Sequence, residues 1–303
     1  MGWKNVIKIA DFTREELEEL FIRAKEMKEA RKRDDLSSKV TVLAFFEPST
    51  RTRLSFKTAI HKLGGDAISI AKPEASSLAK GETFTDTVKI LDGYGDCLII
   101  RHKFEGAARV ASDVAEHPVI NGGDGSFHHP TQAMLDLFSI YELFGTIDGL
   151  TIGMIGDLKY ARTIYSLFNG LSLFDPKRIY LIAPPKLGVR EELEKQITKK
   201  KNCHIVQNTK DVIDELDILY VTRLQKERFP DPLEYKRVAG SYRVELSLLR
   251  QGKDNLKVLH PLPRREEIST QVDDTPYAAY FQQAKWGVPV RMALLSLVME
   301  TTE

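Results

Sequence analysis

A short apolar run, a polar turn and a segment of helical periodicity follow one another early in the chain, and they limit its fold more than any other feature. Residues 40–44 are rich in β-branched side chains, as is typical of a strand buried in a parallel sheet. After the turn, apolar residues recur on one helix face, at Phe56, Ala59, Ile60 and Leu63. Glycines at 64 and 65 end this pattern, so the order predicts a strand, a turn and a helix that ends at glycine.

The turn itself carries hydroxyl and guanidinium groups that favour an anion. Its sequence is Phe45-Phe46-Glu47-Pro48-Ser49-Thr50-Arg51-Thr52-Arg53. Ser49 is the predicted N-cap, and the free N–H groups and dipole of the first helical turn attract negative charge. The planar donor fork of Arg51 suits phosphate. We therefore predict a phosphate site here. A capped helix with surface arginines is the alternative, but two threonines and two arginines in one turn favour the site.

Strands and single helices alternate along the rest of the chain. Further strands are predicted at residues 67–70, 97–101, 118–121, 151–156, 179–183, 204–206, 218–221 and 256–259. A capping box at Thr13 and Glu16 begins the first helix. Later helices are predicted at 83–91, 107–115, 131–144, 163–173, 190–200, 211–216 and 244–250. Strands separated by single helices form βαβ units, so the fold class is α/β, with two doubly wound parallel-sheet domains joined by helices.

The length of the chain, 303 residues, also favours two domains. The helix at 131–144 joins the two halves and ends at Gly145. Near the C-terminus, helical stretches at 276–285 and 288–299 are divided by Gly287 and Pro289. We expect one domain at 1–130, a second at 131–287, and a C-terminal helix at 288–303 that packs back on the first. The active site is expected in the interdomain cleft.

Charge and cysteine content exclude several classes of protein. The formal net charge is +1, from 44 Lys and Arg against 43 Asp and Glu, which gives no reason to expect nucleic acid or an acidic membrane as a partner. The two cysteines, Cys97 and Cys203, have no metal-type spacing and suit a reducing compartment. Neither a signal pattern nor an apolar run of about 20 residues is present. We expect a soluble, cytoplasmic protein.

Polar groups follow two more strands of the first half, where ligands of parallel sheets collect. Arg101 and His102 follow an apolar run, and His129 and Gln132 open the joining helix. The helix start lowers the pKa of an imidazole, so a neutral His129 can polarise a carbonyl group. A surface arginine and a pair of capping histidines remain as alternatives. No histidine or carboxylate set completes a metal site.

The second half offers cations and free backbone carbonyls. The segment 156–162 takes the dinucleotide-binding position but lacks G-x-G-x-x-G, which argues against a nicotinamide or flavin cofactor. Arg162 instead suits a carboxylate, and Arg223 begins a charged loop. In His260-Pro261-Leu262-Pro263-Arg264, prolines hold an extended backbone whose carbonyls can accept from an NH₂ group. This combination, with no nucleophile, metal or cofactor motif, points to direct group transfer between two small anions.

These motifs resemble, in order and over nearly the whole chain, the aspartate/ornithine carbamoyltransferase family. Ornithine enzymes of the family carry a His-Cys-Leu-Pro loop, whereas this chain has His260-Pro261-Leu262-Pro263. The resemblance therefore implies transfer of the carbamoyl group of carbamoyl phosphate to L-aspartate, giving N-carbamoyl-L-aspartate and phosphate, in pyrimidine biosynthesis. No cofactor or metal is implied. A carbamoyltransferase for another amine acceptor, such as ornithine, and a catalytically silent phosphate-binding homologue are the competing hypotheses.

The resemblance also implies a role for each candidate residue. Carbamoyl phosphate would be bound by Ser49, Thr50, Arg51, Thr52, Ser76, Arg101, His129, Gln132 and the backbone at Leu262 and Pro263. Aspartate would be bound by Lys80, Arg162, Arg223 and Gln225. The catalytic set would be Arg51, Thr52, Lys80, Arg101 and His129.

Assembly follows from the same resemblance. Ser76 and Lys80 match residues that reach a neighbouring subunit's site, which implies a homotrimer with shared active sites. Domain closure would bring the loop at 223–228 onto the substrates, and Glu47 would pair with cations of the second domain. Arg265 and Pro230 depart from the family pattern. The extra cation puts those closure contacts in doubt, and the extra proline would stiffen the moving loop. Whether a separate regulatory chain binds, making an allosteric assembly, stays open.

Overall fold

Two parallel β-sheets organise the chain, one in each of two units. The structure is a computed structural model that describes residues 3–30, 33–70, 81–183, 187–224, 231–238 and 242–300. Unit 1 comprises Met1–Leu135 and Trp286–Glu303, and unit 2 comprises Asp136–Lys285. Over the described ranges, no helix combines the length and the apolar character that crossing a bilayer requires.

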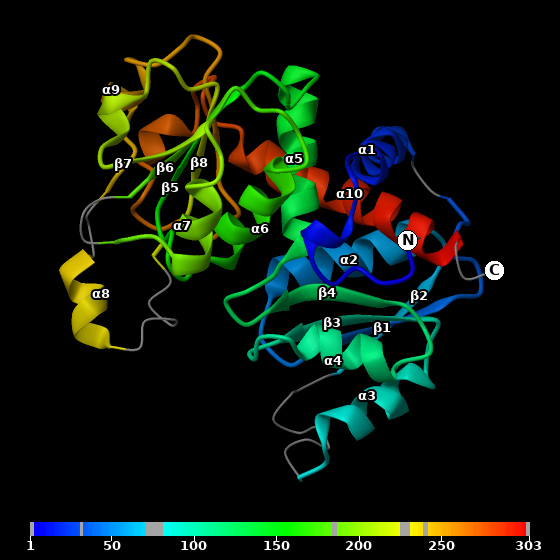
Figure 1. The fold of residues 1–303 in the computed structure, drawn as a ribbon. Coiled ribbons are helices and arrows are strands. Elements are labelled where there is room, and N and C mark those ends of the chain that lie inside the picture. Colours follow the sequence, from blue (N-terminus) through cyan, green and yellow to red (C-terminus); the bar gives the residue numbers. More distant parts are fainter. Residues whose placement is uncertain are drawn as a thin grey trace. The chain divides into compact units, whose positions relative to one another are not determined.

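Unit 1 contains a four-stranded sheet in the order β2-β1-β3-β4. The strands are β1 (Val40–Phe45), β2 (Asp66–Ser69), β3 (Cys97–His102) and β4 (Val119–Asp124). Before and between them lie η1 (Ile9–Asp11), α1 (Arg14–Glu29), α2 (Thr50–Lys62), α3 (Phe84–Asp92) and α4 (Ala107–Val114). Figure 1 shows α2 on one face of the sheet and α3 and α4 on the other. Each of these strands and helices α1–α4 was predicted within a few residues.

The alternation of strand side chains explains the two covered faces. Val42 and Leu98, on neighbouring strands, pack in one cluster with Val88 of α3 and Ala108 of α4. Because side chains alternate along a strand, the residues directly before and after each of these strand residues point to the opposite face of the sheet, where α2 lies. The capping box of α1 is also confirmed: Thr13 Oγ1 accepts from the N–H of Glu16, and Glu16 Oε2 accepts from the N–H of Thr13.

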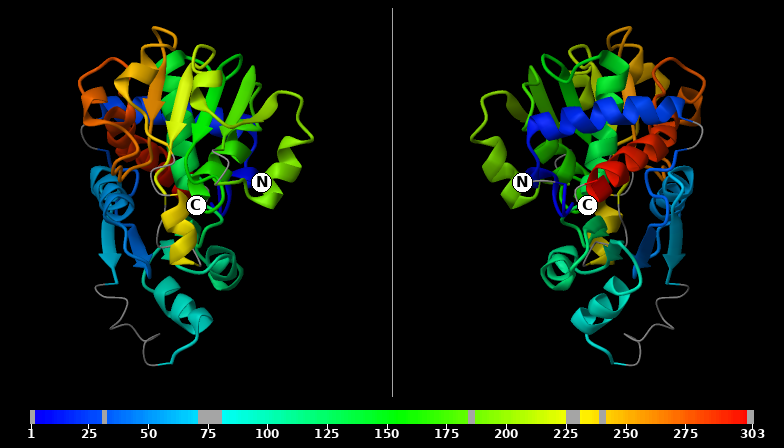
Figure 2. Two further views of the ribbon diagram at one scale, coloured as in Figure 1. Left: turned by 90° about the vertical axis from the view of Figure 1, so that its left-hand side faces the viewer. Right: turned by 90° about the vertical axis from the view of Figure 1, so that its right-hand side faces the viewer.

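The last helix, α10 (Tyr280–Glu300), begins in unit 2 and ends in unit 1. Its last turns lie beside α1, where Arg23 Nη1 is 2.7 Å from Glu300 Oε1 (Figure 2). The predicted division at Gly287 and Pro289 is wrong, because α10 continues through both. A fully buried stretch that follows outweighs the helix-breaking tendency of these two residues. Arg291 Nη1 also donates to the Gly287 carbonyl at 2.9 Å.

Unit 2 contains a five-stranded sheet in the order β7-β6-β5-β8-β9. The strands are β5 (Thr151–Ile155), β6 (Arg178–Ile182), β7 (Cys203–Val206), β8 (Ile218–Val221) and β9 (Lys257–Leu259). Helix α5 (Pro130–Phe144) leads from unit 1 into unit 2. The other helices are α6 (Arg162–Leu171), α7 (Glu191–Ile197), η4 (Thr209–Asp211), α8 (Pro232–Val238), α9 (Leu246–Leu249) and η6 (Thr270–Val272). The five strands were predicted, whereas α8 was not.

Three predicted helices of the second half need correction. In place of the helix predicted at 211–216, η4 ends at Asp211 and residues 212–215 form turns, with N–H groups bonded three residues back. The apolar pattern of 211–216 instead reflects burial of Val212, Ile213 and Leu216. The helix predicted at 244–250 is reduced to α9, since Val244 pairs with Ile268 in a β-bridge. The helix predicted from 276 begins at Tyr280, since Ala278 pairs with Val258.

The carboxyl ends of β5 and β8 approach so closely that only glycine fits between them. Gly156 has φ +129°, and a Cβ there would lie 2.3 Å from both the carbonyl oxygen and Oγ1 of Thr222. Thr222 N–H donates to the Ile155 carbonyl at 2.9 Å, and Asp157 N–H donates to Thr222 Oγ1 at 3.2 Å. This contact fixes the backbone of the residues that directly follow β5 and β8.

The turn after β9 is fixed by a buried histidine and a buried carboxylate. His260 Nε2 lies 2.8 Å from Glu267 Oε1. Burial lowers the pKa of His260 from its ordinary value of 6.5, and the nearby Glu267 does not compensate. Burial opposes ionisation of Glu267, but hydrogen bonds from His260 and from the backbone outweigh it and lower its pKa from 4.5. Neutral His260 beside ionised Glu267 is therefore the folded form.

The contact at Gly156 predicts a steric loss of stability. Gly156→Ala should lower the free energy of unfolding by about 3 kcal/mol, because the new Cβ overlaps Thr222 and the backbone is left-handed. Gly149→Ala is the matched control: its φ is +75°, but nothing lies within 4 Å of its Cβ, so it should lose only about 1 kcal/mol. Denaturant unfolding measures both losses, and equal losses would contradict the steric reason.

The lowered pKa of His260 predicts an acid-sensitive stability. Because the unfolded chain binds this proton more readily, the contribution is complete above about pH 6.5 and decreases as pH falls below it, by at most about 1.4 kcal/mol per pH unit. Unfolding measured from pH 8 to 5 should show a smaller acid loss in His260→Asn than in the wild type. His61→Asn, on the exposed side of α2, leaves the pair intact and should keep the wild-type slope. An unchanged slope in His260→Asn would refute this assignment.

Candidate active site

The polar turn after β1 lies where it was predicted, at the start of α2. Ser49 is the N-cap residue, with φ −156° and ψ 104°, and its side chain makes no capping hydrogen bond to the helix. Thr50 and Arg51 are exposed, whereas Thr52 is buried in the first turn. The hydroxyl of Ser49 is thus not used to cap the helix. This arrangement suits an anion at the helix start.

Arg101 connects the carboxyl ends of three neighbouring strands. It lies near the end of β3, where its backbone carbonyl accepts from the N–H of Phe46 at 2.8 Å. Its Nη2 is 3.0 Å from Glu47 Oε2, after β1, and its Nη1 donates to the Gly122 carbonyl of β4 at 3.0 Å. Glu47 was expected to pair with cations of the second domain, but Arg101, its partner here, belongs to unit 1. Arg101 is buried and held in one orientation at the sheet edge.

His129 and Gln132 are placed by the start of α5. The His129 carbonyl accepts from the N–H groups of Gln132 and Ala133, at 3.0 and 3.1 Å, and Pro130 takes the first helical position. The His129 ring lies 3.4 Å, Nδ1 to Oγ1, from Thr131. Both His129 and Gln132 are buried. They follow β4, the neighbour of β3, so they lie at the same end of the sheet as Arg101.

Two residues that the sequence analysis did not single out hold the turn before His129. Asp124 accepts from the Gly106 N–H and from Asn121 Nδ2, each at 2.9 Å. Asn121 Nδ2 also donates to the Ile7 carbonyl at 2.9 Å. His102, which follows the same apolar run as Arg101, is engaged in a local backbone contact: its Nδ1 accepts from the Phe104 N–H at 3.0 Å. Burial lowers the pKa of His102.

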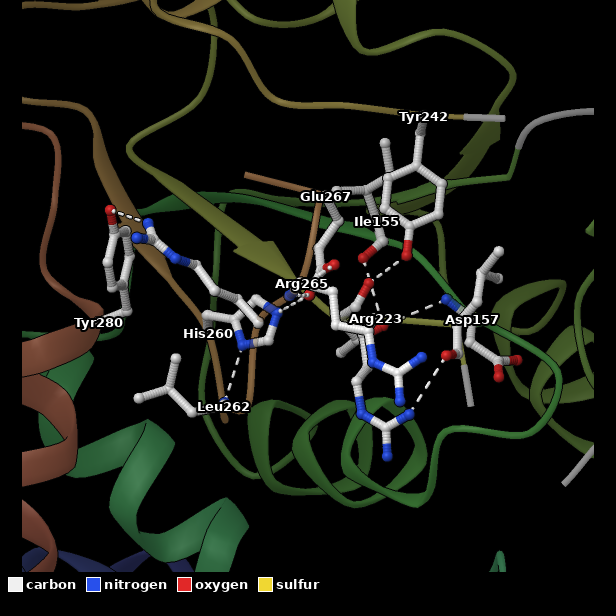
Figure 3. A network of polar contacts seen from close by, with 12 residues as sticks. Ile155, Asp157, Arg223, Tyr242, His260, Leu262, Arg265, Glu267 and Tyr280 are labelled. Carbon is white, nitrogen blue, oxygen red and sulfur yellow. Dashed lines mark hydrogen bonds and ion pairs between the residues drawn. The ribbon is translucent and has the colours of Figure 1, made fainter. Parts of the chain in front are cut away.

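In unit 2, the candidate residues follow three neighbouring strands, β5, β8 and β9. Arg162 is the first residue of α6, after β5, and is buried. Arg223 follows β8, and its Nη1 donates to the Leu224 carbonyl at 3.3 Å. Leu262 and Pro263 lie in the turn after β9. Figure 3 shows Arg223, Asp157 and this turn close together at one end of the sheet.

The residue before Arg223 is fixed by a tyrosine that sequence reasoning missed. The Tyr242 hydroxyl donates to the Thr222 carbonyl (Figure 3). Burial raises the pKa of Tyr242 well above its ordinary value, with nearby Glu267 adding to the effect, so the hydroxyl stays a donor. No local pattern marks Tyr242, because its partner is 20 residues away in the sequence.

The turn after β9 is irregular at Leu262. This residue has φ +56°, in the left-handed region, and the Leu262–Pro263 peptide bond is cis. His260 Nδ1 accepts from the Leu262 N–H at 2.7 Å. Arg264 pairs with Asp273 and donates to the Tyr280 hydroxyl at 3.0 Å. Arg264 is therefore engaged in holding the turn.

Three predicted site residues, Ser76, Lys80 and Gln225, lie outside the described residues, as do Arg228 and Pro230. Across the ranges that the structure describes, no group of three or more His, Cys, Asp or Glu side chains is arranged to hold a metal ion. The described groups are arginines, hydroxyls, an imidazole, an amide and backbone carbonyls. Such a set binds anions and polarises a carbonyl group.

Comparison with known proteins extends over both units. A profile described as aspartate/ornithine carbamoyltransferase, carbamoyl-P binding domain, matches residues 4–142. A second, described as aspartate/ornithine carbamoyltransferase, Asp/Orn binding domain, matches residues 148–298. The aspartate carbamoyltransferase catalytic subunit of Staphylothermus marinus is 53% identical over 300 residues, which cover 97% of this chain and 96% of the relative.

Solved structures agree with these matches. The catalytic subunit of M. jannaschii aspartate transcarbamoylase has a TM-score of 0.90 and 43% identity, covering 98% of both chains. Aspartate transcarbamoylase from Trypanosoma cruzi, in complex with carbamoyl phosphate and aspartate, has a TM-score of 0.91 and 37% identity, covering 98% of this chain and 97% of that chain. With both units matched, this chain belongs to the aspartate/ornithine carbamoyltransferase family.

Proposed function

We propose that this chain transfers the carbamoyl group of carbamoyl phosphate to the amino group of L-aspartate, giving N-carbamoyl-L-aspartate and phosphate. The observation that carries the proposal is the gathering of candidate groups at the carboxyl ends of adjacent strands in each sheet. Relatives at 53% identity are named aspartate carbamoyltransferase catalytic subunits, which supports the same activity. The product is an intermediate of pyrimidine biosynthesis.

Unit 1 is the proposed carbamoyl phosphate-binding domain. The phosphate would lie at the start of α2, bound by Ser49, Thr50, Arg51, Thr52 and Arg101. The carbonyl oxygen of the carbamoyl group would accept from Thr52, Arg101 and His129. Since Glu47 and the Gly122 carbonyl already orient Arg101, its guanidinium needs little reorganisation when charge develops on that oxygen.

Unit 2 is the proposed aspartate-binding domain. Arg162 and Arg223 would pair with the two carboxylates of aspartate, because both follow strands that are neighbours in the sheet. The carbamoyl NH₂ would donate to Gln132 and to the carbonyls of Leu262 and Pro263. Lys80 and Gln225 would add contacts to aspartate, and Ser76 to carbamoyl phosphate.

The reaction then needs positioning and charge stabilisation. The uncharged amine of aspartate attacks the carbamoyl carbon, the C–O bond to phosphate breaks, and the phosphate leaves with the bonding electron pair. The proton that the attacking nitrogen loses goes to the departing phosphate. Arginines hold both anions in reacting geometry, and hydrogen-bond donors stabilise the negative charge on the carbonyl oxygen.

The turn after β9 favours aspartate over ornithine as the acceptor. The ornithine enzymes have a cysteine at the position of Pro261, and an ornithine side chain is a cation that two arginines would repel. We also propose a homotrimer in which Ser76 and Lys80 complete a neighbour's site. Whether a separate regulatory chain binds to that trimer, as in some members of the family, stays an open question.

The acceptor is tested by turnover with carbamoyl phosphate and either amino acid. Phosphate release should be fast with L-aspartate, and kcat/KM for L-ornithine should be lower by about 10⁴, because the ornithine side chain places a cation near the arginines where aspartate has its second carboxylate. Release with ornithine alone would favour the other acceptor. Release with neither would favour a silent phosphate-binding homologue.

Shared sites are tested by mixing two inactive variants. Arg51→Ala should lower kcat by about 10³, because it removes a charged donor from the transferred phosphate. Lys80→Ala should also be inactive, yet a mixture of the two chains should recover part of the activity, since some sites then combine Arg51 of one subunit with Lys80 of another.

The controls distinguish a lost site from a lost fold. Lys57→Ala removes an exposed cation from the same helix as Arg51 and should keep wild-type kcat. A chain with both substitutions should give no recovery in the same mixing experiment with either single variant. Native mass spectrometry should show three subunits. If the Arg51→Ala and Lys80→Ala mixture stays inactive while the trimer forms, sites are not shared.

A further inference from the structure

We propose that Glu267 is a positioning residue that directs the Leu262 and Pro263 carbonyl groups toward the carbamoyl NH₂. This role rests on the proposed function. It adds a residue to the same site and accounts for part of the specificity of that site for the carbamoyl NH₂ group. Glu267 does not belong to the residues that the resemblance implies, and it reaches the substrate only through its neighbours. Its carboxylate closes the turn after β9 into a ring of hydrogen bonds.

The carboxylate of Glu267 joins both sides of the turn. Oε1 accepts from His260 Nε2 at 2.8 Å, and both oxygens lie 3.1 Å from the backbone N–H of Arg265. Figure 3 shows the Glu267 side chain beside His260 and Arg265. The backbone of Glu267 is itself fixed, since its carbonyl accepts from the Val244 N–H at 2.8 Å. A fixed, buried carboxylate therefore determines the distance across the turn.

His260 transmits this position to Leu262. Its Nδ1 accepts from the Leu262 N–H at 2.7 Å, so the ring proton must lie on Nε2, where it is donated to Glu267. The His260 N–H donates to Gln283 Oε1 at 2.9 Å, which holds the histidine backbone as well. Glu267 thus fixes the tautomer and the ring orientation that the Leu262 bond needs.

Leu262 is the residue whose backbone most needs support. Its φ of +56° is costly for a side chain that branches beyond Cβ, and such a conformation persists only where the surroundings hold it. The torsion at Leu262 sets where its own carbonyl and the next one point. Without the ring closed by Glu267, the backbone would relax and both carbonyls would turn away from their present direction.

The far side of the turn has its own anchor, which makes the role of Glu267 separable. Arg264 pairs with Asp273, and Tyr280 donates to the same carboxylate. None of these bonds involves Glu267. A change at Glu267 therefore releases residues 260–263 while residue 264 stays attached.

Glu267→Gln tests this role with little change of shape. A glutamine amide has one acceptor oxygen, so its NH₂ group would face the Arg265 N–H where an acceptor now lies at 3.1 Å. The Arg265 N–H keeps only Oε1 as an acceptor, which His260 also uses, so the ring is weakened on that side. Glu266→Gln is the matched control, since it makes the same chemical change at the exposed neighbouring residue.

The experiment compares two ligands that differ at the recognised group. Acetyl phosphate has a methyl group where carbamoyl phosphate has NH₂, so the ratio of their dissociation constants reports the acceptors of that group, Gln132 and the two carbonyls. Gln132 is the same in every variant, so a change in the ratio reports the carbonyls. Isothermal titration of the full-length chain should give the wild type a preference for carbamoyl phosphate. Glu267→Gln should bind carbamoyl phosphate about tenfold more weakly and acetyl phosphate equally well, as expected for loss of one hydrogen bond. Glu266→Gln should match the wild type.

Two further variants guard against a folding defect. Glu267→Asp keeps both acceptor oxygens and should restore part of the preference. His260→Asn breaks the ring from its other side and should lose the preference as Glu267→Gln does. The positioning role would be overturned if the ratio of the two dissociation constants stayed unchanged in both Glu267→Gln and His260→Asn. It would also be overturned if the variants bound both ligands more weakly by the same factor. A wild type that shows no preference would instead count against the proposed function itself.

Discussion

Parallel pairing of neighbouring strands determines where every described site residue of this chain lies. In unit 1, β3 pairs with β1 on one side and β4 on the other, and in unit 2, β8 lies between β5 and β9. Parallel strands end at the same edge of a sheet, so the segments that follow them meet there although they are distant in the sequence. The same backbone arrangement, used twice, gathers anion-binding groups in each unit.

Buried polar contacts then turn position into orientation. Glu47 and the Gly122 carbonyl orient Arg101, and Tyr242 fixes the residue before Arg223. Burial makes each of these contacts costly to break, because a partner left without its bond would lose solvation as well. A site of this kind can stabilise charge without rearranging, which is what catalysis by positioning needs.

The sequence supported the prediction of most of the fold and of the candidate groups, but not of the residues that orient them. The strand 218–221 and the helix face at Phe56 could be predicted because periodicity and glycine are local signals. Local signals failed where tertiary pairing decided the outcome, as at Val244, Ala278 and the continuous α10. Tyr242 and Glu267 act through partners that the fold alone brings near, and Glu267 stands in a charged run that looks like solvated surface.

The path of the chain through α10 has a consequence for biosynthesis. Unit 2 is one continuous segment, Asp136–Lys285, whereas unit 1 needs the last turns of α10, which bond to Arg23 and Asp35. During translation, residues emerge in order, and domains fold as units. Unit 1, although its strands are made first, therefore cannot complete its core until all of unit 2 and α10 have left the ribosome.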